Sequence, residues 1–290
     1  EGGEIELDAS GSTEELSLRS GSSRFNLACL PVEDFPTSND ADLACRFQIP
    51  ASQFRQLIDK TRFAISTEET RYYLNGIYLH VVTDEEIPVL RSVATDGHRL
   101  ARVEVDLPDG AANMPGVIVP RKAVLELRKL LDSFEQPVDI ALSETKVRVA
   151  VGAAVLTSKL IDGTFPDYQR VIPEGNNKIM KIDGDSFARA VDRVSTVSRD
   201  KSKAIKLSLH GDKLVLSANS PEQGSASEAL SVEYDSDDLD IGFNSRYVLD
   251  MTEQIEGKNM RFEMEDGASP TVVVDVDDAR TVYVLMPMRV

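Results

Sequence analysis

The chain of 290 residues lacks several features that define common classes of protein. No stretch approaches the roughly 20 consecutive apolar residues that a membrane-spanning helix needs. The N-terminal residues Glu-Gly-Gly-Glu-Ile-Glu have neither the basic nor the apolar region of a signal peptide. There are only two cysteines, Cys29 and Cys45, and they show no metal-ligand spacing. These absences predict a cytoplasmic protein with two reduced, buried thiols and no membrane association.

The motifs of common catalytic and cofactor sites are also missing. The sequence has neither standard glycine-rich phosphate loop, and no nucleophile-elbow context surrounds a serine. His80, His98 and His210 fall in separate expected elements, without a cysteine partner or zinc spacing. Acidic clusters at 235–240 and 275–278 resemble calcium loops but lack the third ligand and the following glycine, so we interpret them as solvated turns. We therefore expect no catalytic residue, cofactor or metal.

An internal repeat organises what is present. Phe35-Pro36 and Phe165-Pro166 each follow a strand-like run that ends in an acidic turn, about 130 residues apart. Apolar residues at helical spacing predict four helices, at residues 51–62, 121–132, 185–198 (with Asp185 as its N-cap) and 244–255. Alternating segments between them predict strands at 72–83, 90–105, 138–150, 153–161, 204–209, 213–219, 226–234, 260–264, 271–275 and 280–286.

This repeat predicts an α+β fold of tandem domains, each with two helices packed on antiparallel sheets. Residues 46–173 form one complete copy of the repeat, and residues 174–290 form another. Residues 1–45 correspond only to the C-terminal remnant of a preceding copy. Extending the repeat backwards, we expect about 80 residues of a longer natural chain to precede this sequence.

The net charge of −17 disfavours nucleic-acid binding only if the charge is evenly spread. Residues 50–62, 120–132 and 185–206, which contain the first three expected helices, carry net charges of +2, +2 and +3. Acidic residues concentrate in strands and turns, and the fourth helix does not share the basic character. Two interpretations remain open: the basic residues solvate outer helix faces, or equivalent helices line one positive surface that suits a phosphate backbone.

The segment from Val93 to Ala101 reads as one strand turning into another. Gly97 supplies the positive φ that such a turn often needs, and Asp96 can accept hydrogen bonds from the backbone just ahead of it. A turn does not by itself require the threonine, histidine and arginine that surround this corner. The alternatives are a hairpin tip with an incidental histidine and a binding site.

Five strings distributed over both complete copies resemble the bacterial sliding-clamp family, the beta subunits of DNA polymerase III. They are Arg71-Tyr-Tyr-Leu-Asn-Gly76, Ala94-Thr-Asp-Gly-His-Arg-Leu-Ala101, Val119-Pro-Arg-Lys122, Phe165-Pro-Asp-Tyr168 and the terminal Met286-Pro-Met-Arg-Val290. The resemblance covers the whole chain and follows the family's order. The family has three such domains, which agrees with the preceding copy that the repeat requires.

The resemblance implies a ring. Two chains of three domains each would join head to tail as a homodimer, with helices lining the hole and antiparallel sheets forming the rim. Such a ring encircles double-stranded DNA independently of sequence and keeps the polymerase attached, so its function is that of a processivity factor and not of an enzyme. The DNA polymerase III alpha subunit, the clamp loader and other proteins would bind through short linear peptides.

Three groups of residues carry over from the resemblance. The partner-peptide pocket between the second and third domains would comprise Arg71, Leu74, Thr95, Gly97, His98, Arg99, Leu100, Pro166, Arg170, Val171, Pro270, Val284, Leu285, Met286, Pro287, Met288 and Arg289. The family's DNA-near loop matches Tyr72 and Tyr73, and with the basic helices the DNA-facing set is Arg55, Arg62, Tyr72, Tyr73, Arg121, Lys122, Arg189, Arg193 and Lys201. The dimer interface would include Phe25, Leu27 and Val197.

Two alternatives belong to other classes. The acidic clusters could hold divalent metal in a phosphodiesterase, in which case residues 235–240 would bind metal stoichiometrically. The chain could also be a peptide-binding adaptor without a role on DNA, in which case its basic helices would be dispensable.

Overall fold

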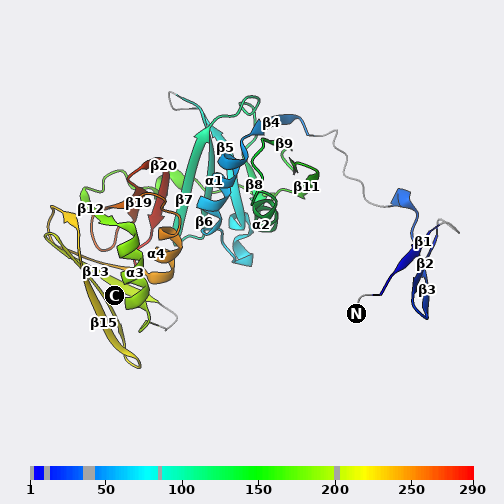
Figure 1. Ribbon diagram of the computed structural model, residues 1–290. Coiled ribbons are helices and arrows are strands. Elements are labelled where there is room, and N and C mark those ends of the chain that lie inside the picture. Colours follow the sequence, from blue (N-terminus) through cyan, green and yellow to red (C-terminus); the bar gives the residue numbers. More distant parts are fainter. Residues whose placement is uncertain (1–2, 10–13, 35–42, 84–86, 199–202) are drawn as a thin grey trace. The chain divides into compact units, whose positions relative to one another are not determined.

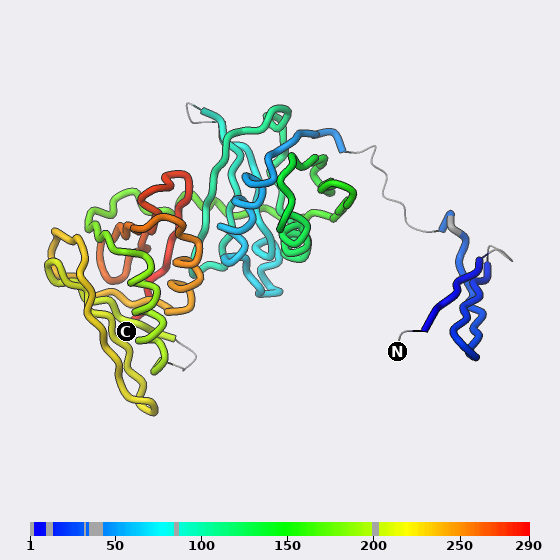
Figure 2. Tube along the Cα trace, viewed as in Figure 1, coloured from blue at the N-terminus to red at the C-terminus, as the bar shows by residue number. Residues whose placement is uncertain are grey.

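The structure, a computed structural model of residues 1–290, describes residues 3–9, 14–34, 43–83, 87–198 and 203–290. The chain forms two compact units, Glu1–Asp42 and Leu43–Val290 (Figures 1 and 2). The smaller unit is an antiparallel meander of β1 (Glu6–Asp8), β2 (Glu15–Ser20) and β3 (Ser23–Ala28), followed by the short 3₁₀ helix η1 (Val32–Asp34). Every residue of β3 is exposed, so these strands have no core of their own.

The first half of the larger unit contains two helices, two antiparallel sheets and two 3₁₀ segments. Its elements are β4 (Cys45–Ile49), α1 (Ala51–Arg62), η3 (Glu69–Leu74), β5 (Gly76–Val82), β6 (Val89–Thr95), β7 (Arg99–Asp106), β8 (Val117–Pro120), α2 (Arg121–Leu130), β9 (Val138–Leu142), β10 (Lys146–Val151), β11 (Ala154–Lys159) and η4 (Tyr168–Val171).

The second half repeats this order of helices and strands, with one short additional strand, β16. Its elements are β12 (Lys178–Asp183), α3 (Gly184–Ser195), β13 (Ala204–His210), β14 (Lys213–Ser220), β15 (Gly224–Ser231), β16 (Glu233–Tyr234), β17 (Leu239–Asn244), α4 (Ser245–Thr252), β18 (Asn259–Met264), β19 (Thr271–Asp275) and β20 (Asp278–Leu285). The repeat seen in the sequence is therefore a repeat of structure.

The helix starts follow from local chemistry. Pro50 and Pro120 stand at the N-caps of α1 and α2, just before residues whose N–H groups would have no partner within the helix. In α3 the cap is Asp183, whose carboxylate accepts a hydrogen bond from the Ser186 N–H at 2.8 Å, so the prediction of Asp185 as the cap was wrong. Asn244 caps α4 in the same way.

Several predicted segments end or begin elsewhere; the helix expected at 244–255, for example, spans only Ser245–Thr252. The strand expected at 72–83 starts only at Gly76, because Tyr72 and Tyr73 lie in η3. Helix α3 ends at Ser195, so Lys203 and Lys206 do not belong to it. The helix itself carries Arg189 and Arg193 against two aspartates and is neutral. The net charge of +3 counted over residues 185–206 therefore does not belong to a helix.

Strand pairing joins the two halves into one unit. One four-stranded sheet has the order β11-β10-β9-β4, and its repeat partner has the order β15-β14-β13-β17. The remaining strands form a nine-stranded sheet of order β16-β12-β18-β19-β20-β7-β6-β5-β8. Strand β7 of the first half pairs with β20 of the second, from Val103 opposite Thr281 to Arg99 opposite Leu285.

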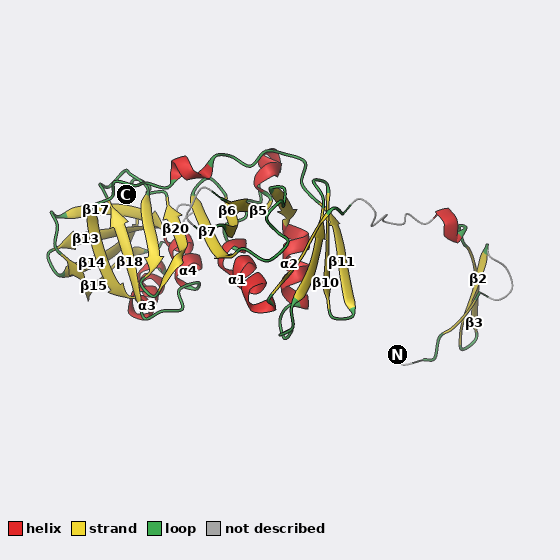
Figure 3. Ribbon diagram, turned by 90° about the horizontal axis from the view of Figure 1, so that it is seen from above, coloured by secondary structure: helices red, strands yellow, loops and turns green. Residues whose placement is uncertain are grey.

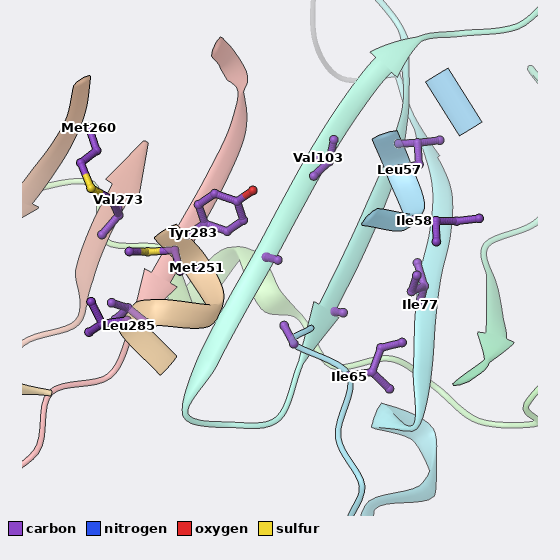
Figure 4. Packing of buried hydrophobic residues seen from close by; sticks show 14 of the residues in the cluster. Leu57, Ile58, Ile65, Ile77, Val103, Met251, Met260, Val273, Tyr283 and Leu285 are labelled. Atoms are coloured by element: carbon purple, nitrogen blue, oxygen red, sulfur yellow. The ribbon is translucent and has the colours of Figure 1, made fainter. Parts of the chain in front are cut away.

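Each of the four helices packs on these sheets: α1 and α2 on strands of the first half, α3 on strands of the second, and α4 on β17 and β20. In Figures 1 and 3 they follow one another in the order α3, α4, α1, α2 along the larger unit. A single hydrophobic cluster extends through both halves, and Figure 4 shows Leu57, Ile77 and Val103 of the first half in the same cluster as Met251 and Tyr283 of the second. Burying one such aliphatic side chain contributes about 1.5–3 kcal/mol. In the part of the chain that the structure describes, no helix is long and apolar enough to span a membrane.

A buried ion pair ties η4 to the sheet. Arg91 of β6 is 1% exposed, and its Nη2 lies 2.6 Å from Oε1 of Glu104 on β7. Its Nη1 donates a hydrogen bond to the Tyr168 hydroxyl at 2.9 Å, and Tyr168 begins η4. Charges in a low-dielectric interior are retained only with such partners, so the position of η4 depends on Arg91.

Substituting Arg91→Ala is expected to lower the free energy of unfolding by about 3–5 kcal/mol, because Glu104 would remain buried without its main partner. Urea unfolding followed by circular dichroism measures the change. Lys213→Ala, on the exposed side of β14, is the control and is expected to change the free energy by at most about 0.5 kcal/mol. A loss below about 1 kcal/mol for Arg91→Ala would contradict a structural role for the pair.

Candidate functional site

The turn between β6 and β7 is built by its own side chains. Gly97 has a φ of +86°, and the Asp96 carboxylate accepts hydrogen bonds from the N–H groups of His98 and Arg99 at 2.9 and 3.0 Å. The Thr95 hydroxyl donates to the Arg99 carbonyl at 2.7 Å and accepts from the Gly97 N–H at 3.1 Å. The predicted hairpin is therefore confirmed, and the threonine, like the aspartate, fixes its shape.

This turn brings together segments from four parts of the chain. An added Cβ on Gly97 would lie 2.7 Å from Nη1 of Arg71, so the arginine of η3 passes directly over the turn. The N–H of Met286 donates to the His98 carbonyl at 2.9 Å, which holds the C-terminal segment beside it. On β7 and β20, Leu100 stands opposite Val284.

A small apolar cluster lies beside the turn and draws on both halves. Its buried members are Leu74, Val93, Leu100, Ile118, Phe165, Tyr168 and Val284. Leu285, the neighbour of Val284, is buried in the main core. Pro270 precedes β19, whose first residue stands opposite Leu285, and its carbonyl accepts a hydrogen bond from the Asn176 side chain.

Around this cluster the surface is apolar with charged groups at its edge. Val171 and Met286 are 42% and 38% exposed, and Pro166 is also exposed. Pro287 and Met288 are half-buried, whereas Arg289 is exposed. Arg71 pairs with Glu68, and Arg170 with Asp167 at 2.7 Å, both at the surface. Of the residues that the resemblance assigns to the partner-peptide pocket, we call all except Arg99 the candidate peptide site.

Arg99 differs from the others because its guanidinium lies at the junction between the halves. Its Nε is 3.1 Å from Asp96, its Nη1 is 2.5 Å from Asp250 of α4, and its Nη2 donates to the Phe63 carbonyl at 2.7 Å. The group also stacks on the Phe63 and Tyr247 rings. Arg99 is only 9% exposed and lines a junction cavity of about 620 Å³ together with His98. The structure thus gives its head group a role in joining the halves.

His80 and Arg91 both contact the hydroxyl of Tyr168, which is a member of this apolar cluster. His80 Nε2 lies 3.0 Å from the Tyr168 hydroxyl, and its ring stacks on Tyr78 with 4.5 Å between centroids. Burial and, secondarily, the positive charge of Arg91 lower the pKa of His80 to about 4. This histidine is therefore neutral at physiological pH and serves the packing of η4.

A basic groove lies where α1 ends and α2 begins. A cavity of about 740 Å³ is lined by five cations from the two helices. They are Arg62, Arg121, Lys122, Arg128 and Lys129, and the rest of the lining is Ser66, Thr67, Asn75, Leu125 and Glu126. Arg121 and Lys122 are exposed. Among the described residues, no carboxylate lies within ion-pair distance of Arg121, Lys122 or Arg189, so these three cations remain available.

Other predicted DNA-facing cations have partners inside the protein. Arg55 donates to the carbonyls of Leu131 and Phe134 at 3.1 and 2.8 Å, which bonds α1 to the end of α2. Arg193 bonds the Glu228 carboxylate through two nitrogens, although it is 57% exposed. Lys201 lies outside the described residues.

Tyr72 and Tyr73 of η3 contact each other edge-on, with 5.7 Å between ring centroids. Tyr72 is 54% exposed.

The residues predicted for the dimer interface lie in both units. In the smaller unit, Phe25 and Leu27 are 53% and 44% exposed on β3. Val197 is half-buried just after α3, which packs against β15.

Metal ligands do not gather anywhere in the described part of the chain, where no group of three histidine, cysteine or acidic residues is placed to hold an ion. The interpretation of 275–278 as a solvated turn was wrong for Asp275, which is 3% exposed and accepts hydrogen bonds from the N–H groups of Glu256, Gly257 and Asp277. The thiols of Cys29 and Cys45 are free, as predicted, but only partly buried.

Comparison with known proteins identifies the family. The sequence model of the DNA polymerase III beta subunit central domain matches residues 48–167, and that of the C-terminal domain matches residues 169–289. The chain belongs to the DNA polymerase III beta subunit family. Members of this family are non-catalytic processivity factors.

Relatives at high identity agree with this assignment. The beta sliding clamp of Caulobacter vibrioides is 50% identical over 290 residues, covering 100% of this chain and 78% of that protein. A solved structure of the Bartonella birtlesii sliding clamp bound to griselimycin has a TM-score of 0.91 at 50% identity, covering 100% of this chain and 77% of that one. A Caulobacter crescentus clamp structure has a TM-score of 0.93 at 50% identity, with the same coverage.

Some residues around the site carry no recognisable signal in the sequence. Tyr247 and Asp250 were visible only as positions on the fourth helix, and Lys60 only as one more basic residue on the first. Lys60 is 5% exposed and its Nζ lies 3.0 Å from Asp278 at the start of β20. These residues meet their partners only because β7 and β20 pair, so no local pattern could have indicated them.

The lowered pKa of His80 predicts a pH-dependent stability. Between pH 6.5 and about 4 the unfolded chain protonates this histidine whereas the folded chain does not, so stability falls as the pH falls through that window. His80→Gln is expected to remove this component, about 1–2 kcal/mol after allowance for partial solvent exposure. Urea unfolding at pH 7 and pH 4.5 measures it, with the exposed His210→Gln as control. Equal pH dependence in wild type and His80→Gln would contradict the prediction.

Proposed function

We propose that this chain acts as a DNA sliding clamp, a ring subunit that encircles duplex DNA and tethers the replicative polymerase and other proteins through the candidate peptide site. The observation that carries the proposal is the pairing of β7 with β20. It shows how one repeat extends the sheet of the next. The same pairing applied again would join successive repeats head to tail, as a closed ring requires.

The repeat identifies which strand edges are left for further pairing. Strand β11 is the last strand of the first half, as β20 is of the second half. Strand β15 of the second half is likewise equivalent to β7 of the first half. Strands β11 and β15 both end their sheets, so each offers an unpaired edge. In the smaller unit, β3 occupies the position equivalent to β11 and β20, as the last of three antiparallel strands.

By this equivalence, β15 of one chain would pair with β3 of a second chain, and two chains would close a homodimeric ring. Phe25 and Leu27 on β3 would then be covered, as would the region around Val197. Such an interface would explain why large apolar side chains are exposed on a strand that has no core of its own. We assign residues 1–45, 46–173 and 174–290 to the first, second and third clamp domains of this ring.

The four helices, which follow one another in the order α3, α4, α1, α2, would face the DNA. Arg121, Lys122 and Arg189 supply cations without ion-pair partners among the described residues, with Arg62 beside the first two in the basic groove. Contacts of this kind neutralise phosphates and carry no sequence information, so the ring can slide. The acidic side chains elsewhere in the chain repel DNA and so weaken binding, and a clamp that slides must not bind DNA tightly.

Partner proteins would insert apolar side chains of a short peptide beside Val171 and Met286. Methionine adapts to different side chains, and Arg71, His98 and Arg170 can bond polar groups at the ends of the peptide. The polymerase alpha subunit and the clamp loader are the expected partners, in the cytoplasm. A metal-dependent phosphodiesterase has no supporting ligand group among the described residues, and an adaptor without a DNA role would leave the basic groove unexplained.

The proposal predicts topological binding. Loaded onto nicked circular DNA, the full-length clamp is expected to remain bound, and to be lost when a restriction enzyme linearises the circle. Gel filtration of the loaded complex at about 150 mM salt measures retention. Equal retention on both forms would contradict encirclement.

Charge reversal tests the DNA-facing assignment. The double variant Arg121→Glu and Lys122→Glu is expected to weaken non-specific duplex binding and to reduce the slope of log K against log salt by about 2, because two phosphate contacts are lost. Fluorescence anisotropy at several salt concentrations measures it. The matched control, Lys178→Glu with Lys181→Glu on β12, makes the same charge change on a strand and is expected to leave the slope unchanged. An equal effect of both variants would show that net charge, and not the groove, governs binding.

A further inference from the structure

One glycine outside every predicted site lies against the C-terminal segment. On β17, Ile241 and Phe243 face the core and are 1% exposed, whereas Asp240 faces outward and is exposed. By strand alternation Gly242 also faces outward, yet it is buried. Since it has no side chain to bury, another part of the chain must cover it.

The cover is the C-terminal segment. The N–H of Met288 donates to the Gly242 carbonyl at 2.9 Å, at the edge of β17 that pairs with no other strand. A Cβ added to Gly242 would lie 2.5 Å from the Met288 carbonyl oxygen and 2.5 and 2.6 Å from the two methyl carbons of Val290. A side chain could rotate away from such a contact, but a backbone oxygen cannot, so this close approach requires glycine.

The same segment is held at its other end by the turn. Met286 donates its N–H to His98 in the first half, and Met288 donates to Gly242 in the second. Pro287 between them has no N–H to donate. Two backbone hydrogen bonds, one to each half, therefore define the path of residues 286–288, which form part of the candidate peptide site.

We propose that Gly242 is a positioning residue for the peptide site: it contacts no peptide, but its missing side chain lets the C-terminal segment pack against β17 and thereby orients Met286 and Met288. This inference rests on the proposed function only for the identity of the ligand. The position of the segment itself can be tested without any ligand.

The first test reads the segment directly. In full chains labelled with ¹³C-methyl methionine, Gly242→Ala is expected to shift the methyl signals of Met286 and Met288 towards random-coil values and to sharpen them. The signals of the buried Met180, Met251 and Met264 are expected to stay in place, which excludes general unfolding. Met286→Leu and Met288→Leu assign the two signals. Unchanged signals for Met286 and Met288 would overturn the inference.

The second test measures ligand binding. The probes are a fluorescein-labelled peptide containing leucine, phenylalanine and one aspartate, and griselimycin, the ligand of the solved Bartonella birtlesii clamp. Gly242→Ala is expected to raise the dissociation constant of the peptide about tenfold, since the affinity loses the ordering that one backbone hydrogen bond provides. Gly175→Ala, at an exposed glycine with no atom within 4 Å of the added Cβ, is the matched control and is expected to bind like wild type.

A third measurement separates positioning from a general effect on the strand. In chains that end at Leu285, Gly242→Ala is expected to be neutral or slightly stabilising, because alanine restricts the unfolded chain more than glycine. In the full chain the same substitution is expected to lower the melting temperature. Equal effects in both backgrounds would overturn the inference. If wild type binds neither probe while the methionine signals shift as expected, the peptide-binding proposal fails and the positioning role stands.

Discussion

The pairing of β7 with β20 is the interaction on which the rest of this structure depends. It converts two sheets that belong to different repeats into one sheet of nine strands, and it brings Leu100 opposite Val284. Backbone hydrogen bonds of a strand pair leave little freedom of rotation between the halves. Polar contacts on both sides of the seam add to this: Lys60 bonds Asp278, and Arg99 bonds Asp250.

Two surfaces arise from this seam. On one, the helices of both halves form a row with an exposed basic groove at the junction of α1 and α2. On the other, the 95–99 turn, η3, η4 and the C-terminal segment meet around a small apolar cluster. A clamp needs both a surface that attracts phosphates weakly and a separate surface that binds partners, and one strand pair supplies the geometry for each. Arg99 extends from the turn to Asp250 of α4, so one side chain contacts both the turn of the candidate peptide site and the junction.

The charge distribution shows how a strongly acidic chain can still carry exposed cations without ion-pair partners among the described residues. Arg55 and Arg193 look equivalent to Arg121 in the sequence, but the first bonds backbone carbonyls and the second bonds Glu228. Arg121 and Lys122 start α2, whose first turn carries no acidic residue, and Glu126 of the next turn pairs with Lys129. Which cations remain available is therefore decided by what packs beside each one, and a count of charges along the sequence cannot show it.

Local sequence determined much of this protein. Helical periodicity and the prolines before α1 and α2 located both helices, because these signals act within a few residues of the chain. The turn at Asp96-Gly97 was equally predictable, since its hydrogen bonds join neighbours. The cap of α3, assigned to Asp185 instead of Asp183, shows the limit even here, because two aspartates two residues apart offer the same chemistry. What only the tertiary structure decided lies at long range: the β7–β20 seam, the junction role of Arg99, and the packing of the C-terminal segment on Gly242. Each of these joins residues about 40 to 190 positions apart, and such contacts depend on the folded positions of whole sheets rather than on any pattern within a single segment.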